Sequence, residues 1–76
     1  MRNDNMQRPL DVLGNSVDKT IIVKTKAGED VIGVLKAFDS HINVWLDDAK
    51  IEGEKEIKIG RVLIRGDNIV YISPGK

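Results

Sequence analysis

The stretch Asp30–Asp39, DVIGVLKAFD, decides how this chain folds. It is long for a β-strand, it is rich in the β-branched residues that favour strands, and Gly33 interrupts it. A glycine inside a strand marks a position where the missing side chain lets a sheet bend sharply and pack on itself. The sequence therefore predicts a long strand that bends at Gly33.

Apolar runs bounded by turn residues extend from this strand in both directions. The segment Ala27–Glu29 just before it predicts a tight hairpin turn. The other predicted strands cover residues 20–26, 42–51, 56–64 and 69–73.

A short helix is predicted at residues 8–15, because Pro9 suits a first helical turn and Gly14 or Asn15 can end it. The order of elements predicts a mostly β fold, in which a short N-terminal helix precedes a strongly bent five-stranded antiparallel small barrel.

Length and composition limit the possible functions. With 76 residues, 41% hydrophobic and 32% charged, the chain is expected to form a single domain at residues 8–76, preceded by a flexible arm at residues 1–7. The sequence shows no secretion signal, no membrane-spanning run and no cysteine, so we expect a cytoplasmic protein without disulfides or a zinc site. Twelve basic and twelve acidic residues give zero net charge, which argues against nucleic-acid binding by bulk positive charge.

The last two predicted strands are apolar on both faces, although a strand of a small barrel has only one core face. One explanation is that the second face is covered by the N-terminal helix or stays exposed to solvent. The other is that these are edge strands, which pair with a neighbouring subunit. Joining one edge to a different edge gives a head-to-tail contact, so we expect a closed ring. The predicted subunit interface consists of Val62, Leu63, Ile64, Ile69, Val70, Tyr71 and Ile72.

Two motifs indicate a family. The stretch Phe38–Leu46, with Gly28 and Gly33 before it, resembles the first motif of the Sm and Sm-like (Lsm) proteins, and Ile64–Asn68 resembles their second motif. The resemblance covers residues 8–73 and is closest to an archaeal Sm-like protein. It implies a heptameric ring, in which the fourth strand of one subunit pairs with the fifth strand of the next. It also implies binding of uridine-rich single-stranded RNA at the central pore, and a role in RNA processing or ribonucleoprotein assembly.

The resemblance assigns a role to each of five residues. His41 and Arg65 are implied to stack on the two sides of a base, and Asn43 to read its edge. The chemistry of these side chains is suitable, because both stacking groups are flat and the amide carries a donor and an acceptor. Asp39 is implied to support the loop, and Asp67 to support the pocket by hydrogen bonding.

Other interpretations of the same residues stay open. Each polar residue taken singly also suits a solvated turn, and a ring that mainly binds proteins, such as RNA-processing proteins, is the alternative function. Catalysis is not expected, because one histidine and no cysteine make a poor basis for acid–base or nucleophilic chemistry. No cofactor or metal is expected either. Trp45 and Tyr71 lie in strands and are predicted to serve in packing, so neither is assigned to the base pocket.

Overall fold

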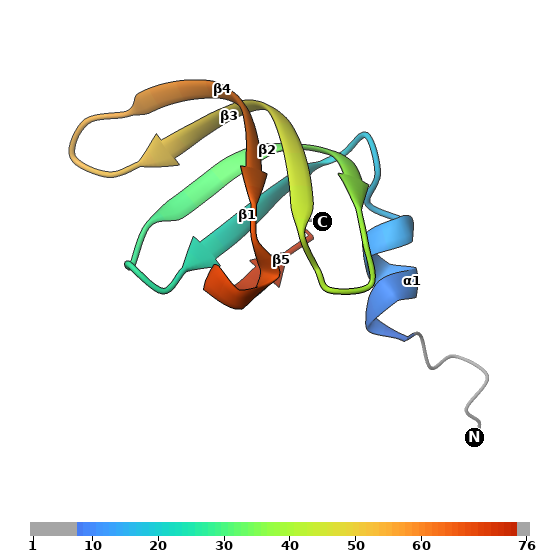
Figure 1. Ribbon diagram of the computed structural model, residues 1–76. Helices are drawn as coiled ribbons and strands as arrows, with labels where there is room; N and C mark the ends of the chain where they lie inside the picture. Colours follow the sequence, from blue (N-terminus) through green and yellow to red (C-terminus); the bar gives the residue numbers. More distant parts are fainter. Residues whose placement is uncertain (1–7, 75–76) are drawn as a thin grey trace.

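The computed structural model describes residues 8–74 and consists of a short helix followed by a curved sheet (Figure 1). The arm predicted at residues 1–7 lies outside the described residues, as do residues 75–76. The elements are α1 (Pro9–Gly14), β1 (Thr20–Thr25), β2 (Asp30–Phe38), β3 (Val44–Glu52), β4 (Ile57–Ile64), a 3-10 turn (Gly66–Asn68) and β5 (Ile69–Ser73). The predicted helix and five strands are confirmed to within two residues at each end.

The five strands form one antiparallel sheet in the order β4-β3-β2-β1-β5. Figure 1 shows the sheet curling into a small barrel, with the β3–β4 hairpin projecting from the body and α1 beside the β2–β3 loop. Because β4 and β5 stand at the two ends of the strand order, they are the edge strands of the protomer. Their free edges are the places where another chain can add a strand.

The predicted bend at Gly33 is confirmed. The pairing of β2 with β3 shifts register between Ile32 and Val34, so the sheet is irregular at this glycine. A Cβ atom at Gly33 would lie 3.1 Å from the Cβ atoms of both Leu46 and Ala49. The absence of a side chain therefore allows β3 to cross closely over β2.

The core lies inside the curl. Strand β1 alternates regularly between buried and less buried positions, as period two requires. The largest fully buried side chains come from β1, β2 and β3, and are Ile21, Val23, Leu35, Val44 and Leu46. Each such side chain contributes roughly 1.5–3 kcal/mol by burial. Leu13 of α1 closes one end of this core. Over residues 8–74, no helix is long and apolar enough to cross a membrane.

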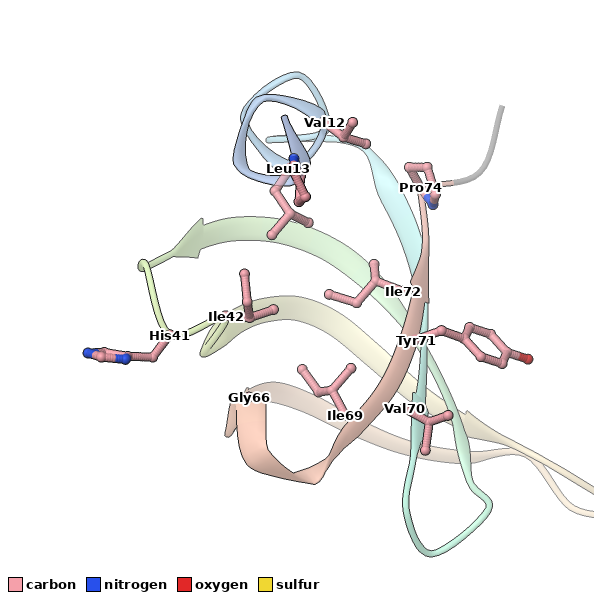
Figure 2. Close-up of a pocket in the computed structure, with 11 residues that line it drawn as sticks. Val12, Leu13, His41, Ile42, Gly66, Ile69, Val70, Tyr71, Ile72 and Pro74 are labelled. Carbon is pink, nitrogen blue, oxygen red and sulfur yellow. The ribbon is translucent and has the colours of Figure 1, made fainter. Parts of the chain in front are cut away.

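The two edge strands bury more of their apolar side chains within the protomer than their composition suggests. Figure 2 shows Ile69 and Ile72 of β5 pointing toward α1 and the core, while Val70 and Tyr71 point away from it. In β4, Ile64 is only 7% exposed, so its side chain needs no neighbouring subunit to cover it. The large side chains left uncovered by the protomer at the predicted interface are Leu63, Val70 and Tyr71, each more than half exposed.

Candidate nucleic-acid interface

Two turns meet at one end of the barrel. The β2–β3 loop carries residues 39–43, and residues 65–68 connect β4 to β5. They are adjacent because Val44 pairs with both Phe38 of β2 and Ile64 of β4. Gly66 packs directly on the loop, since a Cβ atom there would overlap the carbonyl oxygen of His41. The two sequence motifs are thus in direct contact.

The side-chain amide of Asn43 joins these turns. Its Nδ2 donates a hydrogen bond to Oδ2 of Asp39 at 3.0 Å, and its Oδ1 accepts one from the backbone N–H of Gly66 at 2.8 Å. The two bonds fix which end of the amide is the donor and which is the acceptor. One N–H and one oxygen lone pair of the amide are not used by these two bonds and can face a ligand.

Asp39 also organises the loop itself. Its Oδ1 accepts hydrogen bonds from the backbone N–H groups of His41, at 2.9 Å, and Asn43, at 3.1 Å. Hydrogen bonds from the Asn43 side chain and backbone, and then from His41, hold the pKa of the Asp39 carboxyl below its ordinary value. A lowered pKa in the folded state stabilises the fold above the unfolded pKa, and this contribution is lost as pH falls through the folded value. The loop is therefore expected to keep this arrangement at neutral pH.

A hollow opens where the turns meet. It is lined by His41, Asn43, Arg65, Gly66 and Asp67. The structure thus places four of the five predicted site residues around one hollow, and the fifth, Asp39, hydrogen-bonds one of them. Figure 2 shows the imidazole of His41 pointing outward from the loop, away from the apolar residues of α1 and β5.

The arginine of the site is held only loosely. Nη2 of Arg65 lies 3.1 Å from Oδ2 of Asp67, and both side chains are more than two thirds exposed. An exposed ion pair of this kind contributes between about 0 and 1 kcal/mol. The guanidinium can therefore leave Asp67 and lie against a planar ligand at little cost.

The site combines flat, exposed groups with a fixed amide. Such an arrangement suits a heterocyclic base that is stacked on its faces and hydrogen-bonded at its edge. Among residues 8–74, no three His, Asp or Glu side chains gather closely enough to hold a metal ion.

The structure adds one contact that the sequence does not predict, and it leaves two aromatic side chains more exposed than expected. No pattern in the sequence predicts that Gly66 touches His41, since that contact joins residues far apart in the chain. Trp45 and Tyr71, which are predicted to serve in packing, are 41% and 52% exposed in the protomer. Tyr71 belongs to the predicted subunit interface, so its packing role stays a prediction, whereas Trp45 is not among the predicted interface residues. The alternation of β3 could have indicated the exposure of Trp45, because the residues on either side of it face the core.

The comparisons with known proteins agree with this geometry. A family model described as the LSM domain matches residues 11–74. A protein of Methanosarcina barkeri named "Putative snRNP Sm-like protein" is 49% identical over 69 residues, which cover 88% of this chain and 96% of the relative.

Solved structures show the same similarity. The SmAP1 heptamer of P. aerophilum matches with a TM-score of 0.87 and 30% identity, over 93% of this chain and 97% of that one. The Sm protein of Pyrococcus abyssii, solved in complex with a uridine heptamer, matches with a TM-score of 0.84 and 42% identity, over 91% of this chain and 100% of that one. The family model covers most of the chain and the relatives align along nearly their whole length, so the resemblance is confirmed: the chain belongs to the LSM domain family of Sm-like proteins.

Proposed function

We propose that this chain assembles into a heptameric ring and binds uridine-rich single-stranded RNA at the ring's central pore. The ring acts in RNA processing or ribonucleoprotein assembly in the cytoplasm, without catalysis of its own. The observation that carries the proposal is the Asn43 amide, which is fixed by Asp39 and Gly66 in a hollow between exposed His41 and Arg65. The heptameric and uridine-bound relatives support the same assembly and ligand.

Base selection follows from the fixed amide. The edge of uracil carries a ring N–H beside a carbonyl group, so it pairs with an acceptor and a donor side by side. The free lone pair and the free N–H of Asn43 supply that pair. Cytosine and adenine carry the donor on the exocyclic amino group and the acceptor on the ring nitrogen, which is the reverse of uracil. In the position that fits uracil, the amide held by Asp39 and Gly66 would therefore face like groups, and unpaired polar groups cost about 1–3 kcal/mol.

Oligouridine is therefore expected to bind at least about tenfold more tightly than oligoadenosine or oligocytidine of equal length. The measurement is fluorescence anisotropy of labelled oligonucleotides, combined with native mass spectrometry to count subunits and RNA chains. Equal affinity for the three homopolymers would show that the hollow does not read base identity. A ring that forms but binds none of them would favour the protein scaffold.

The stacking residues provide a second test. His41→Ala or Arg65→Ala removes one flat surface, and stacking is worth about 1–3 kcal/mol per base. Because every subunit carries the change, the loss is expected to be much larger for long oligouridine than for a mononucleotide. The effect is measured as the ratio of dissociation constants for the two ligands.

Two lysines serve as matched controls. Lys24 and Lys50 form ion pairs with Asp30 and Glu56, outside the hollow. Replacing either lysine with alanine is expected to leave the affinity for RNA nearly unchanged and to alter its salt dependence slightly. Loss of binding in the lysine variants together with intact binding in His41→Ala and Arg65→Ala would refute the base pocket.

A further inference from the structure

The outer face of the sheet carries the chain's only tryptophan close to the candidate pocket. Trp45 is 41% exposed, although tryptophan is a residue that folded proteins usually cover. Its cross-strand neighbours on this face are Ala37 of β2 and Leu63 of β4, and both are exposed in the protomer, although Leu63 also belongs to the predicted subunit interface. The indole is thus the largest group in an exposed apolar row across three strands.

A cation lies over this indole. The guanidinium carbon of Arg61 is 5.8 Å from the centre of the Trp45 ring, within the range of a cation–π interaction. Nε of Arg61 donates a hydrogen bond to Oδ1 of Asp47 at 3.0 Å, which orients the guanidinium while leaving its terminal amino groups unused by that bond. The Arg61 side chain is 69% exposed. A flat aromatic surface and an oriented, accessible cation therefore stand together.

The row is continuous with the hollow described above. A shallow depression on the outer face is lined by Asp39, Asn43, Trp45 and Leu63, together with Ala37 and Phe38. Asn43 lines both this depression and the hollow that holds His41 and Arg65. A ligand held at the Asn43 edge therefore has Trp45 within the adjoining depression.

We infer that Trp45 and Arg61 form a second nucleobase site, which stacks a neighbouring nucleotide of the RNA strand whose uracil occupies the hollow. This inference rests on the proposed function, because it needs RNA in the first site. The exposed indole supplies the stacking surface and Arg61 supplies the charge that attracts a phosphate. Each subunit then contacts more than one nucleotide.

The charge and position of the row favour RNA over an apolar protein segment. An apolar segment would have to bury Arg61 and Asp47 together, which costs several kcal/mol per ion before pairing is counted. A stacked base leaves both charged groups at the solvent edge. Trp45 also stands one strand inward from the free edge of β4, so a strand added at that edge would lie beside Leu63.

The single tryptophan makes the test direct, since all tryptophan emission comes from Trp45. We expect saturating oligouridine to quench that emission. Uridine monophosphate, which fills only the hollow at Asn43, is expected to change the emission little. Trp45→Leu keeps an apolar side chain but removes the flat surface, and Trp45→Phe keeps a smaller one. Trp45→Leu is expected to weaken the binding of long oligouridine by at least about fivefold and to leave the binding of uridine monophosphate unchanged. Trp45→Phe is expected to have an intermediate effect on oligouridine binding.

The possible outcomes separate this inference from the proposed function. If labelled oligouridine binds but the emission is constant and Trp45→Leu binds normally, the second site is wrong and the first stands. If Trp45→Leu breaks the ring in native mass spectrometry, the row is a subunit contact and the second site is equally wrong. If the unchanged chain binds no oligouridine, both proposals fail together.

Discussion

Val70→Asp is expected to dissociate the ring into monomers or smaller oligomers at micromolar protein concentration. Val70 lies in the edge strand β5 and its side chain is 59% exposed in the protomer. In the proposed ring this strand pairs with β4 of the next subunit, so the new carboxylate would be enclosed without a partner. An enclosed, unpaired charge costs several kcal/mol, and a closed ring bears that cost at every joint.

The measurement is sedimentation velocity together with native mass spectrometry at several protein concentrations. Leu10→Asp is the matched control, because Leu10 is another exposed apolar residue, 40% exposed, that lies in α1 and not in an edge strand. We expect the control to keep the assembly of the unchanged chain. A ring that survives Val70→Asp would show that β5 is not the joint.

Loss of the ring is also expected to lower affinity for long oligouridine by at least about a hundredfold. Separate protomers bind each uridine independently, whereas linked pockets act on one strand at a high effective concentration. Affinity for uridine monophosphate should change little, because the hollow at Asn43 is built from a single protomer. The two ligands thus separate the joint from the pocket.

Local pattern was sufficient to predict the fold. Alternation along β1 and β2, the turn residues between strands and the interior Gly33 all act over a few residues, so they are visible in the sequence. The bend could be predicted because Gly33 leaves room for β3, and the 3.1 Å distances to Leu46 and Ala49 show how little room there is.

The candidate site was predictable in its residues but not in its geometry. The resemblance named Asp39, His41 and Asn43 from one motif and Arg65 and Asp67 from the other. The contact between the motifs depends on how β2, β3 and β4 bring two turns together, which no local pattern encodes. The interface residues illustrate the same limit, because both faces of β5 look alike in sequence while only Val70 and Tyr71 are uncovered.

Gly66→Ala tests that contact most directly and is expected to disable the pocket. The added methyl group would overlap the carbonyl oxygen of His41, so the two turns must separate. Separation lengthens the 2.8 Å hydrogen bond from the Gly66 N–H to Asn43 and releases the amide that presents the base edge. Overpacking of this kind costs about 1–3 kcal/mol of stability.

We expect Gly66→Ala to lower the thermal midpoint and to reduce affinity for uridine monophosphate by about tenfold or more, because the fixed amide is lost. Gly53→Ala is the matched control, since the nearest atom to its new methyl group would be 3.8 Å away, an ordinary contact in the β3–β4 loop. Asn43→Ala removes the amide without a clash and is expected to reduce the affinity for uridine monophosphate as much as Gly66→Ala does. If Gly66→Ala binds like the unchanged chain while Asn43→Ala does not, the amide acts without support from Gly66, and the contact between the motifs is structural only.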